Sequence, residues 1–134
     1  MLPRYFKLRV YNDAGVSVTV QVDWLPYKAG PTGLTYGTPA TVITPGAIAS
    51  AAASTSAAQD NSTAANLGGH LMVTATPASA PSGNKRLLVY LLGSNDNTLF
   101  EDLQGAVGEG FGNVVATFAL AGTSALHQSF EVPP

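Results

Sequence analysis

The sequence contains no cysteine, and it carries very little charge. Only 10% of its 134 residues are charged, whereas a typical soluble domain has roughly 25%. Without cysteine the chain can form neither a disulfide nor a thiolate zinc site. Its surface must consist largely of small polar and apolar residues. Because such a surface repels neighbouring molecules weakly, the composition favours a protein that functions inside an assembly.

Clustered positive charge and long apolar runs are also missing. The six basic residues are scattered and the formal net charge is −2, which argues against binding to nucleic-acid phosphates. No apolar stretch approaches the ~20 residues of a membrane span, and the charged N-terminal segment differs from a secretory signal peptide. We therefore expect one domain over residues 1–134, made in the cytoplasm and contacting neither nucleic acid nor a membrane.

The strongest structural signal is the apolar run Leu87–Leu92, within the stretch Lys85–Asp102. All six of its residues are apolar, so both faces of a strand there would be apolar. A run of this length between turn signals is typical of a fully buried strand rather than a helix. The sequence thus predicts a central strand that is covered on both sides.

Two segments near the N-terminus alternate between apolar and polar residues. They are Tyr5–Tyr11 and Val16–Trp24, and turn-forming residues separate them. Alternation of this kind is typical of half-buried strands. We predict that the two strands form a hairpin and that Trp24, on the apolar face, points into the core.

The segment from about 25 to 39 is dense in proline and glycine, so it is predicted to be a long loop. Loops of this length in compact domains are often interaction elements. Tyr27 and Tyr36 lie in it, close to Trp24 in sequence. These tyrosines either form a contact surface for a partner or a sugar, or pin the loop to the sheet.

An alanine-, serine- and threonine-rich tract covers Ala47–Ala58. Alanine favours helix, but the serines compete for backbone hydrogen bonds. Ile48 is the only large apolar residue, so a helix would have almost no apolar stripe to bury. We predict an extended segment, with a helix as the alternative.

About eight short strands emerge, separated by loops rich in proline and glycine. The last, at 126–132, is followed by the short tail 133–134, because proline cannot donate to a strand ladder. This pattern predicts an all-β fold, an antiparallel β-sandwich that is jelly-roll-like.

No pattern in the sequence indicates catalysis or a cofactor, and we expect neither. His70 and His127 are far apart in sequence, and the glycines between 105 and 112 lack the order of a dinucleotide-binding loop. Oxygen donors that could bind calcium occur close together at Asp96, Asn97, Glu101 and Asp102. Their spacing is not that of an EF-hand, and such residues are common in turns, so we expect no metal and keep calcium as the alternative.

Several short motifs between residues 46 and 102 resemble a group of small virion proteins of tailed bacteriophages. In that pattern an alanine- and serine-rich strand ends in a D-N-S turn, and a V-Y-L strand closes in an S-x-D-G turn followed by an aromatic residue. Here Asn97 takes the place of the glycine, and Phe100 that of the aromatic residue. The matching segments are Gly46–Ser50, Asp60–Ser62, Leu71–Val73, Val89–Leu92 and Ser94–Asp96.

The resemblance implies a non-enzymatic structural protein of the virion, most simply a capsid decoration protein bound to a repeating lattice of the major capsid protein. It also implies a homo-oligomer, such as a trimer. A tail component, or a carbohydrate-binding host-attachment module that uses Trp24, Tyr27 and Tyr36, is the alternative. The side chains expected to contact a partner are Tyr27, Tyr36, Arg4, Lys7 and Arg9.

Overall fold

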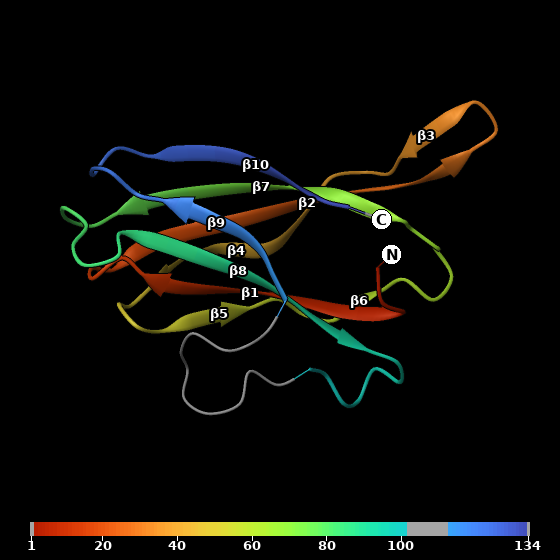
Figure 1. Ribbon diagram of the computed structural model, residues 1–134, viewed down its shortest axis with the longest axis horizontal. Coiled ribbons are helices and arrows are strands. Elements are labelled where there is room, and N and C mark those ends of the chain that lie inside the picture. Colours follow the sequence, from red (N-terminus) through yellow and green to blue (C-terminus); the bar gives the residue numbers. More distant parts are fainter. Residues whose placement is uncertain (1, 102–112, 134) are drawn as a thin grey trace.

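The computed structural model describes residues 2–101 and 113–133 and contains two β-sheets packed face to face (Figure 1). These residues form ten strands and no helix. No helix that could cross a membrane is therefore present in the described part of the chain. The strands are β1 (Tyr5–Asp13), β2 (Val18–Gly30), β3 (Gly33–Tyr36), β4 (Ala40–Ile48), β5 (Ala53–Thr55), β6 (Gln59–Asp60), β7 (Gly68–Pro77), β8 (Arg86–Ser94), β9 (Asn113–Ala119) and β10 (Leu126–Val132).

Both sheets are antiparallel throughout. The first has the order β5-β1-β8-β9, with β6 also paired to β1, and the second has the order β10-β7-β2-β3, with β4 also paired to β2. The chain changes sheet at five connections, β1–β2, β4–β5, β6–β7, β7–β8 and β9–β10. The predicted β-sandwich is confirmed, with ten strands instead of about eight.

The core lies between the two sheets and follows the predicted alternation. β1 contributes Phe6, Leu8 and Val10, and β2 contributes alternate residues from Val18 to Trp24. Trp24 is only 5% exposed, and its ring meets the ring of Phe6 edge-on at 5.6 Å. The prediction that Trp24 points into the core is confirmed.

β8 is the buried strand that the sequence predicts. It lies between β1 and β9, and Leu87, Val89 and Leu91 belong to the main core. The alternate residues Leu88, Tyr90 and Leu92 are buried on the opposite face, in a second cluster with Tyr11. Burial on both faces is therefore confirmed.

The predicted hairpin between Tyr5–Tyr11 and Val16–Trp24 is wrong. β1 pairs with β5, β6 and β8, whereas β2 pairs with β3, β4 and β7 in the other sheet. Alternation records that one face of a strand is buried, but it does not identify the strand's neighbour. The turn after β1 carries the chain across the sandwich and does not return it along the same sheet.

The side chain of Asn12 holds this crossing in place. Asn12 is fully buried, and its Nδ2 donates to the carbonyl oxygens of Val16 at 2.7 Å and Ile48 at 2.8 Å. Its Oδ1 accepts from the Ala14 N–H at 3.0 Å. One amide thus joins the end of β1, the turn and the end of β4.

The predicted loop at 25–39 is also wrong, because β2 continues through Pro26 as far as Gly30. β3 then pairs back onto it, with Tyr27 opposite Tyr36 and Gly30 opposite Gly33. The Gly37 N–H donates to the Pro26 carbonyl at 2.8 Å. The two paired segments form a hairpin, residues 27–36, that extends beyond the sandwich (Figure 1). We call this hairpin the arm.

The tract Ala47–Ala58 is extended, which confirms the prediction, and it contains no helix. It contains the end of β4 and the short strand β5, with a turn between them in which Ala51 has φ of 59°. β5 pairs with β1 from Ala53 to Thr55. Small side chains therefore occupy the edge of the first sheet.

Replacing Asn12 with alanine should lower the free energy of unfolding by about 3 kcal/mol or more. Two carbonyl groups and one N–H would lose their hydrogen-bond partner, and each such loss costs about 1–3 kcal/mol. Urea unfolding curves measure this change. The matched control is Asn95→Ala in an exposed turn, which should change the free energy by less than about 0.5 kcal/mol. Equal effects of the two substitutions would contradict the role given to Asn12.

Candidate functional site

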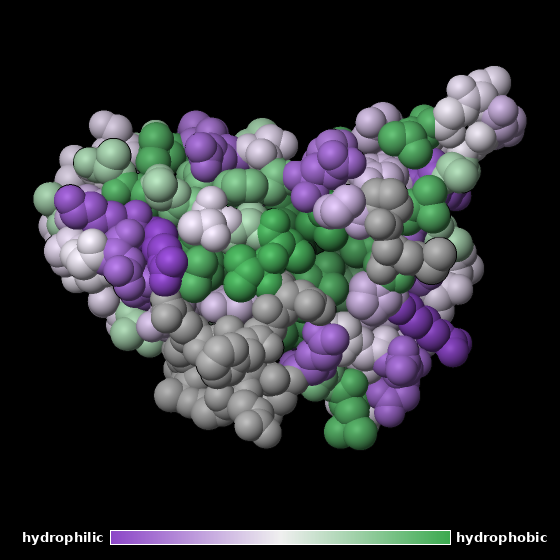
Figure 2. All heavy atoms as spheres, in the orientation of Figure 1, coloured by the Kyte–Doolittle hydropathy of each residue, from purple (hydrophilic) through white to green (hydrophobic). Residues whose placement is uncertain are grey.

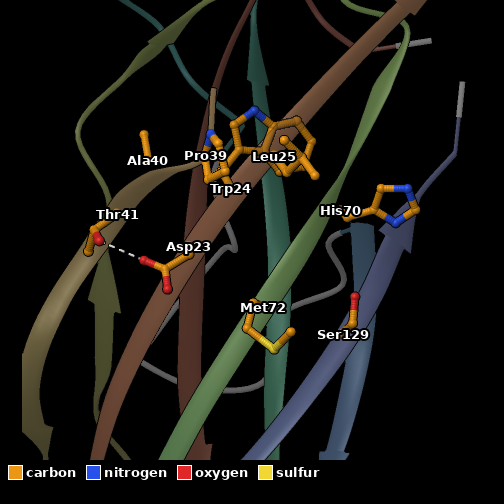
Figure 3. A pocket seen from close by; sticks show the side chains of 9 residues that line it. All are labelled: Asp23, Trp24, Leu25, Pro39, Ala40, Thr41, His70, Met72 and Ser129. Carbon is orange, nitrogen blue, oxygen red and sulfur yellow. Dashed lines mark hydrogen bonds between the residues drawn. The ribbon is translucent and has the colours of Figure 1, made fainter. Parts of the chain in front are cut away.

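A groove on the outer face of the second sheet, next to the base of the arm, is the candidate site (Figure 3). It has a volume of about 400 Å³. We call it the outer groove. Its lining residues are Asp23, Trp24, Leu25, Pro39, Ala40, Thr41, His70, Met72 and Ser129.

The register of four strands brings these residues together. Asp23 on β2 lies opposite Thr41 on β4 and opposite Met72 on β7. Met72 in turn lies opposite Ser129 on β10. A single row across the sheet therefore carries a carboxylate, two hydroxyls and a thioether. In the next row, Leu25 lies opposite His70.

Asp23 is held by neutral donors only. Gln21 Nε2 donates to its two carboxylate oxygens at 3.1 and 3.0 Å, and Thr41 Oγ1 donates to Oδ1 at 2.6 Å (Figure 3). The ion pair between Arg86 and Asp13 lies at another part of the fold. The three hydrogen bonds thus fix the orientation of the Asp23 carboxylate, and no described residue gives it a cationic partner.

A cluster of rings lies beside the groove. The Tyr27 hydroxyl donates to Glu131 Oε1 at 3.1 Å, and the Tyr27 ring lies 5.7 Å from the His70 ring. Tyr36 stacks on His70 at 6.0 Å with an interplanar angle of 29°. Tyr27 is only 2% exposed beneath these side chains, whereas Tyr36 is 52% exposed. The cluster therefore fixes the base of the arm to the sheet.

The Tyr27 hydroxyl is a weaker acid than an ordinary tyrosine. Burial, and next the hydrogen bond to Glu131, raise the pKa of Tyr27 above its ordinary value of 10.0. Ionisation would place a second negative charge beside the Glu131 carboxylate. Tyr27 therefore serves as a neutral donor in this cluster.

Two adjacent glycines allow both aromatic side chains of β2 to be buried. A Cβ on Gly69 would collide with the Trp24 ring, and a Cβ on Gly68 would lie 2.5 Å from the Tyr27 hydroxyl. Any larger residue would displace one of the rings. The Gly68–Gly69 pair thus supports Trp24 in the core and Tyr27 on the outer face.

The arm has one apolar and one polar face. Its register places Ala29 opposite Leu34 and Tyr27 opposite Tyr36 on one face, with Lys28 opposite Thr35 on the other. Every residue from 31 to 40 is exposed, and Leu34 is 54% exposed. Figure 2 shows the arm standing clear of the rest of the molecule. Its apolar face therefore has little cover from its own chain.

The structure separates the side chains predicted to contact a partner. Tyr36 is exposed at the base of the arm, whereas Tyr27 is buried. Lys7 and Arg9 alternate with the inward residues of β1, so they lie on the outer face of the first sheet. Lys7 Nζ lies 4.1 Å from the centroid of the Phe100 ring. Arg9 Nε is buried without a hydrogen-bond partner. Arg4 is exposed. The basic and aromatic residues thus do not form one surface.

The placement of the aromatic residues also bears on sugar binding. That hypothesis needs flat, accessible rings on which a sugar can stack. Trp24 is in the core and Tyr27 is covered, which leaves Tyr36 as the one exposed ring of the three. The structure therefore does not favour a glycan-binding platform built from them.

Two of the four residues considered for calcium, Asp96 and Glu101, accept hydrogen bonds from nearby backbone N–H groups. Asp96 Oδ1 accepts from the backbone N–H groups of Leu99 at 2.9 Å and Thr98 at 2.8 Å, and these bonds lower the pKa of Asp96 below its ordinary value. Asn97 has φ of 61°, as expected for a residue in the glycine position. Glu101 Oε2 accepts from the Gly93 N–H at 3.2 Å. Asp102 lies outside the described residues.

No group of three histidine, cysteine, aspartate or glutamate side chains that could hold a metal occurs in residues 2–101 and 113–133. His127 Nδ1 lies 3.1 Å from the Thr74 hydroxyl, four positions along β7 from His70. The two histidines therefore do not meet. The glycine-rich segment 105–112 lies outside the described residues.

The sequence alone did not predict the outer groove. In the sequence, Asp23 is only one of the polar positions of an alternating strand. Its neighbours Thr41, Met72 and Ser129 are distant in sequence, and only the strand register brings them to Asp23. A bulge in the pairing of β2 with β4, at Val20 to Asp23, could not be read from either strand.

Comparison with known proteins gives no assignment. No family model matches this chain, and neither a curated protein nor a solved structure matches it.

The raised pKa of Tyr27 predicts a stability change at high pH. Because the folded-state pKa exceeds the unfolded value of 10.0, the stabilisation is complete below pH 10 and is lost as the pH rises through the folded-state pKa. Unfolding measured from pH 9 to 12 should show a steeper loss for the wild type than for Tyr27→Phe. The tyrosinate absorbance difference between the two proteins should have its midpoint above 10. A midpoint at or below 10 would contradict the buried hydrogen bond.

Proposed function

We propose that this chain is a non-enzymatic structural protein of a tailed-bacteriophage virion that attaches to a repeating protein lattice, as a capsid decoration or stabilising protein. The observation that carries the proposal is the arm. A paired hairpin that extends from a compact sandwich with an exposed apolar face is suited to contact with another protein.

The exposed apolar side chains give the arm a reason to bind. Leu34 and Tyr36 are more than half exposed on the same face of the arm, and burial of apolar surface contributes about 25 cal/mol per Å². β3 pairs only with β2 in the described part of the chain. Its other edge therefore offers backbone groups that can extend a partner's sheet.

The low charge of the chain supports an assembled state. With 10% charged residues, copies placed side by side on a lattice repel one another weakly. Attachment at repeated positions also fits a homo-oligomer, such as a trimer, at a symmetry axis. The resemblance described above includes tail components, so the lattice is that of the head in the first proposal and of the tail in the alternative.

Quantitative mass spectrometry of purified particles tests the proposal. Heads and tails of the phage whose genome encodes this chain are separated, and the copy number is measured against the major protein of each. We expect a fixed, lattice-like ratio in the heads. A fixed ratio in the tails supports the alternative, and absence from both fractions refutes the virion function.

The arm predicts which substitutions prevent attachment. Leu34→Asp should lower binding to particles that lack this chain by at least tenfold, because a charge would be placed on the apolar face of the arm. Thr35→Asp, a charge on the opposite face of the same strand, is the matched control and should retain binding. Co-sedimentation with particles measures both. Equal loss, or no loss for Leu34→Asp, would contradict the use of the apolar face.

A further inference from the structure

We propose that the outer groove is a binding site for a basic side chain, the guanidinium of an arginine or the ammonium of a lysine, presented by a partner protein. The site combines a positioned carboxylate with apolar walls. This basic side chain would be one contact of the lattice attachment proposed above. Only the identification of the partner as a virion protein rests on the proposed function.

The carboxylate of Asp23 is arranged to receive a cation. Three hydrogen bonds from Gln21 and Thr41 fix its orientation, yet they come from neutral groups and leave its charge uncompensated. A carboxylate offers about four lone-pair positions, so a position remains for an incoming N–H. Because Asp23 is only partly exposed, a paired cation gains more there than at a fully solvated acid.

The walls of the groove suit the aliphatic stem of a long basic side chain. Leu25 and Pro39 lie on one side of Asp23, and Met72 lies directly opposite it on β7. Met72 is 42% exposed, and its flexible thioether adapts to the shape of what it contacts. Lysine and arginine bury their methylene groups against such surfaces while the charged end meets a polar group.

The chain's own basic residues do not supply this cation. None of the six lines the groove. Asp23 lines the groove, and a second acid, Glu131, lies nearby and accepts a hydrogen bond from the Tyr27 hydroxyl. The outer face of the second sheet is therefore complementary to a partner that carries positive charge.

A methionine of the groove provides a direct test. Protein labelled with ¹³C at the methionine methyl groups gives a signal from Met72, which lines the groove. The probe is Nα-acetyl-arginine amide, whose one charge is the guanidinium. Its neutral counterpart is Nα-acetyl-citrulline amide, which has the same shape. We expect a saturable shift of Met72 with the arginine probe and binding at least tenfold weaker with the citrulline probe.

Two variants that remove one negative charge each separate the site from general electrostatics. Asp23→Asn should weaken arginine binding by at least tenfold, whereas Asp60→Asn, an exposed acid on β6, should leave it unchanged. A cooperative urea unfolding transition in unliganded Asp23→Asn verifies that the variant is folded. Citrulline titrations of the wild type provide the same discrimination without any substitution.

Three outcomes of the probe titrations would overturn the proposal. They are an unmoved Met72 signal at saturating arginine probe, an equal response to the citrulline probe, and full binding by Asp23→Asn. A wild type that self-associates through Asp23, and dissociates on Lys28→Gln, would instead assign the groove to a second copy and also overturn it. No virion is needed for these measurements, so their failure is distinct from failure of attachment to particles.

Discussion

The buried amide of Asn12 is the constraint on which the rest of the structure depends. It bonds to the turn after β1 and to the end of β4, so the chain leaves one sheet and enters the other. β1 is then free to pair with β8, while β2 lies between β7 and β4. That position of β2 creates the outer groove along its middle and the arm at its end.

The arm and the groove are thus two consequences of one long strand. β2 has thirteen residues, and β4 pairs with it only as far as Trp24. Beyond that point its partner on this side is β3, and from Tyr27 onward the two form the arm. Tyr27 and His70 tie the base of the arm to the sheet. The exposed apolar face of the arm and the carboxylate of the groove therefore belong to one side of the molecule.

The sequence could predict which residues are buried but not which strands are neighbours. Alternation identified the inward face of β2, and an uninterrupted apolar run identified the doubly buried β8, because each strand's sequence records which of its faces are buried. The sequence of β1 does not indicate that β8 is its neighbour. The turn-forming residues after β1 suggested a hairpin instead. Pro26 and the glycines around it suggested a loop, although only residues 31–32 form the turn of the arm.

The candidate site was harder to predict because it depends on strand register. Tyr36 was predicted to contact a partner from its aromatic character, and the structure leaves its side chain exposed. Tyr27 looked equivalent in sequence, but the absence of a side chain at Gly68 lets it be buried. Asp23 belongs to a candidate site only because the strand register places Thr41 and Met72 beside it.

A reconstruction of the intact particle with this chain placed in density tests the central claim most directly. We predict that the arm and the outer face of the second sheet lie against a neighbouring protein, with a basic side chain of that neighbour at Asp23. A chain whose arm and second sheet face solvent, with contacts made only by the first sheet, would contradict it.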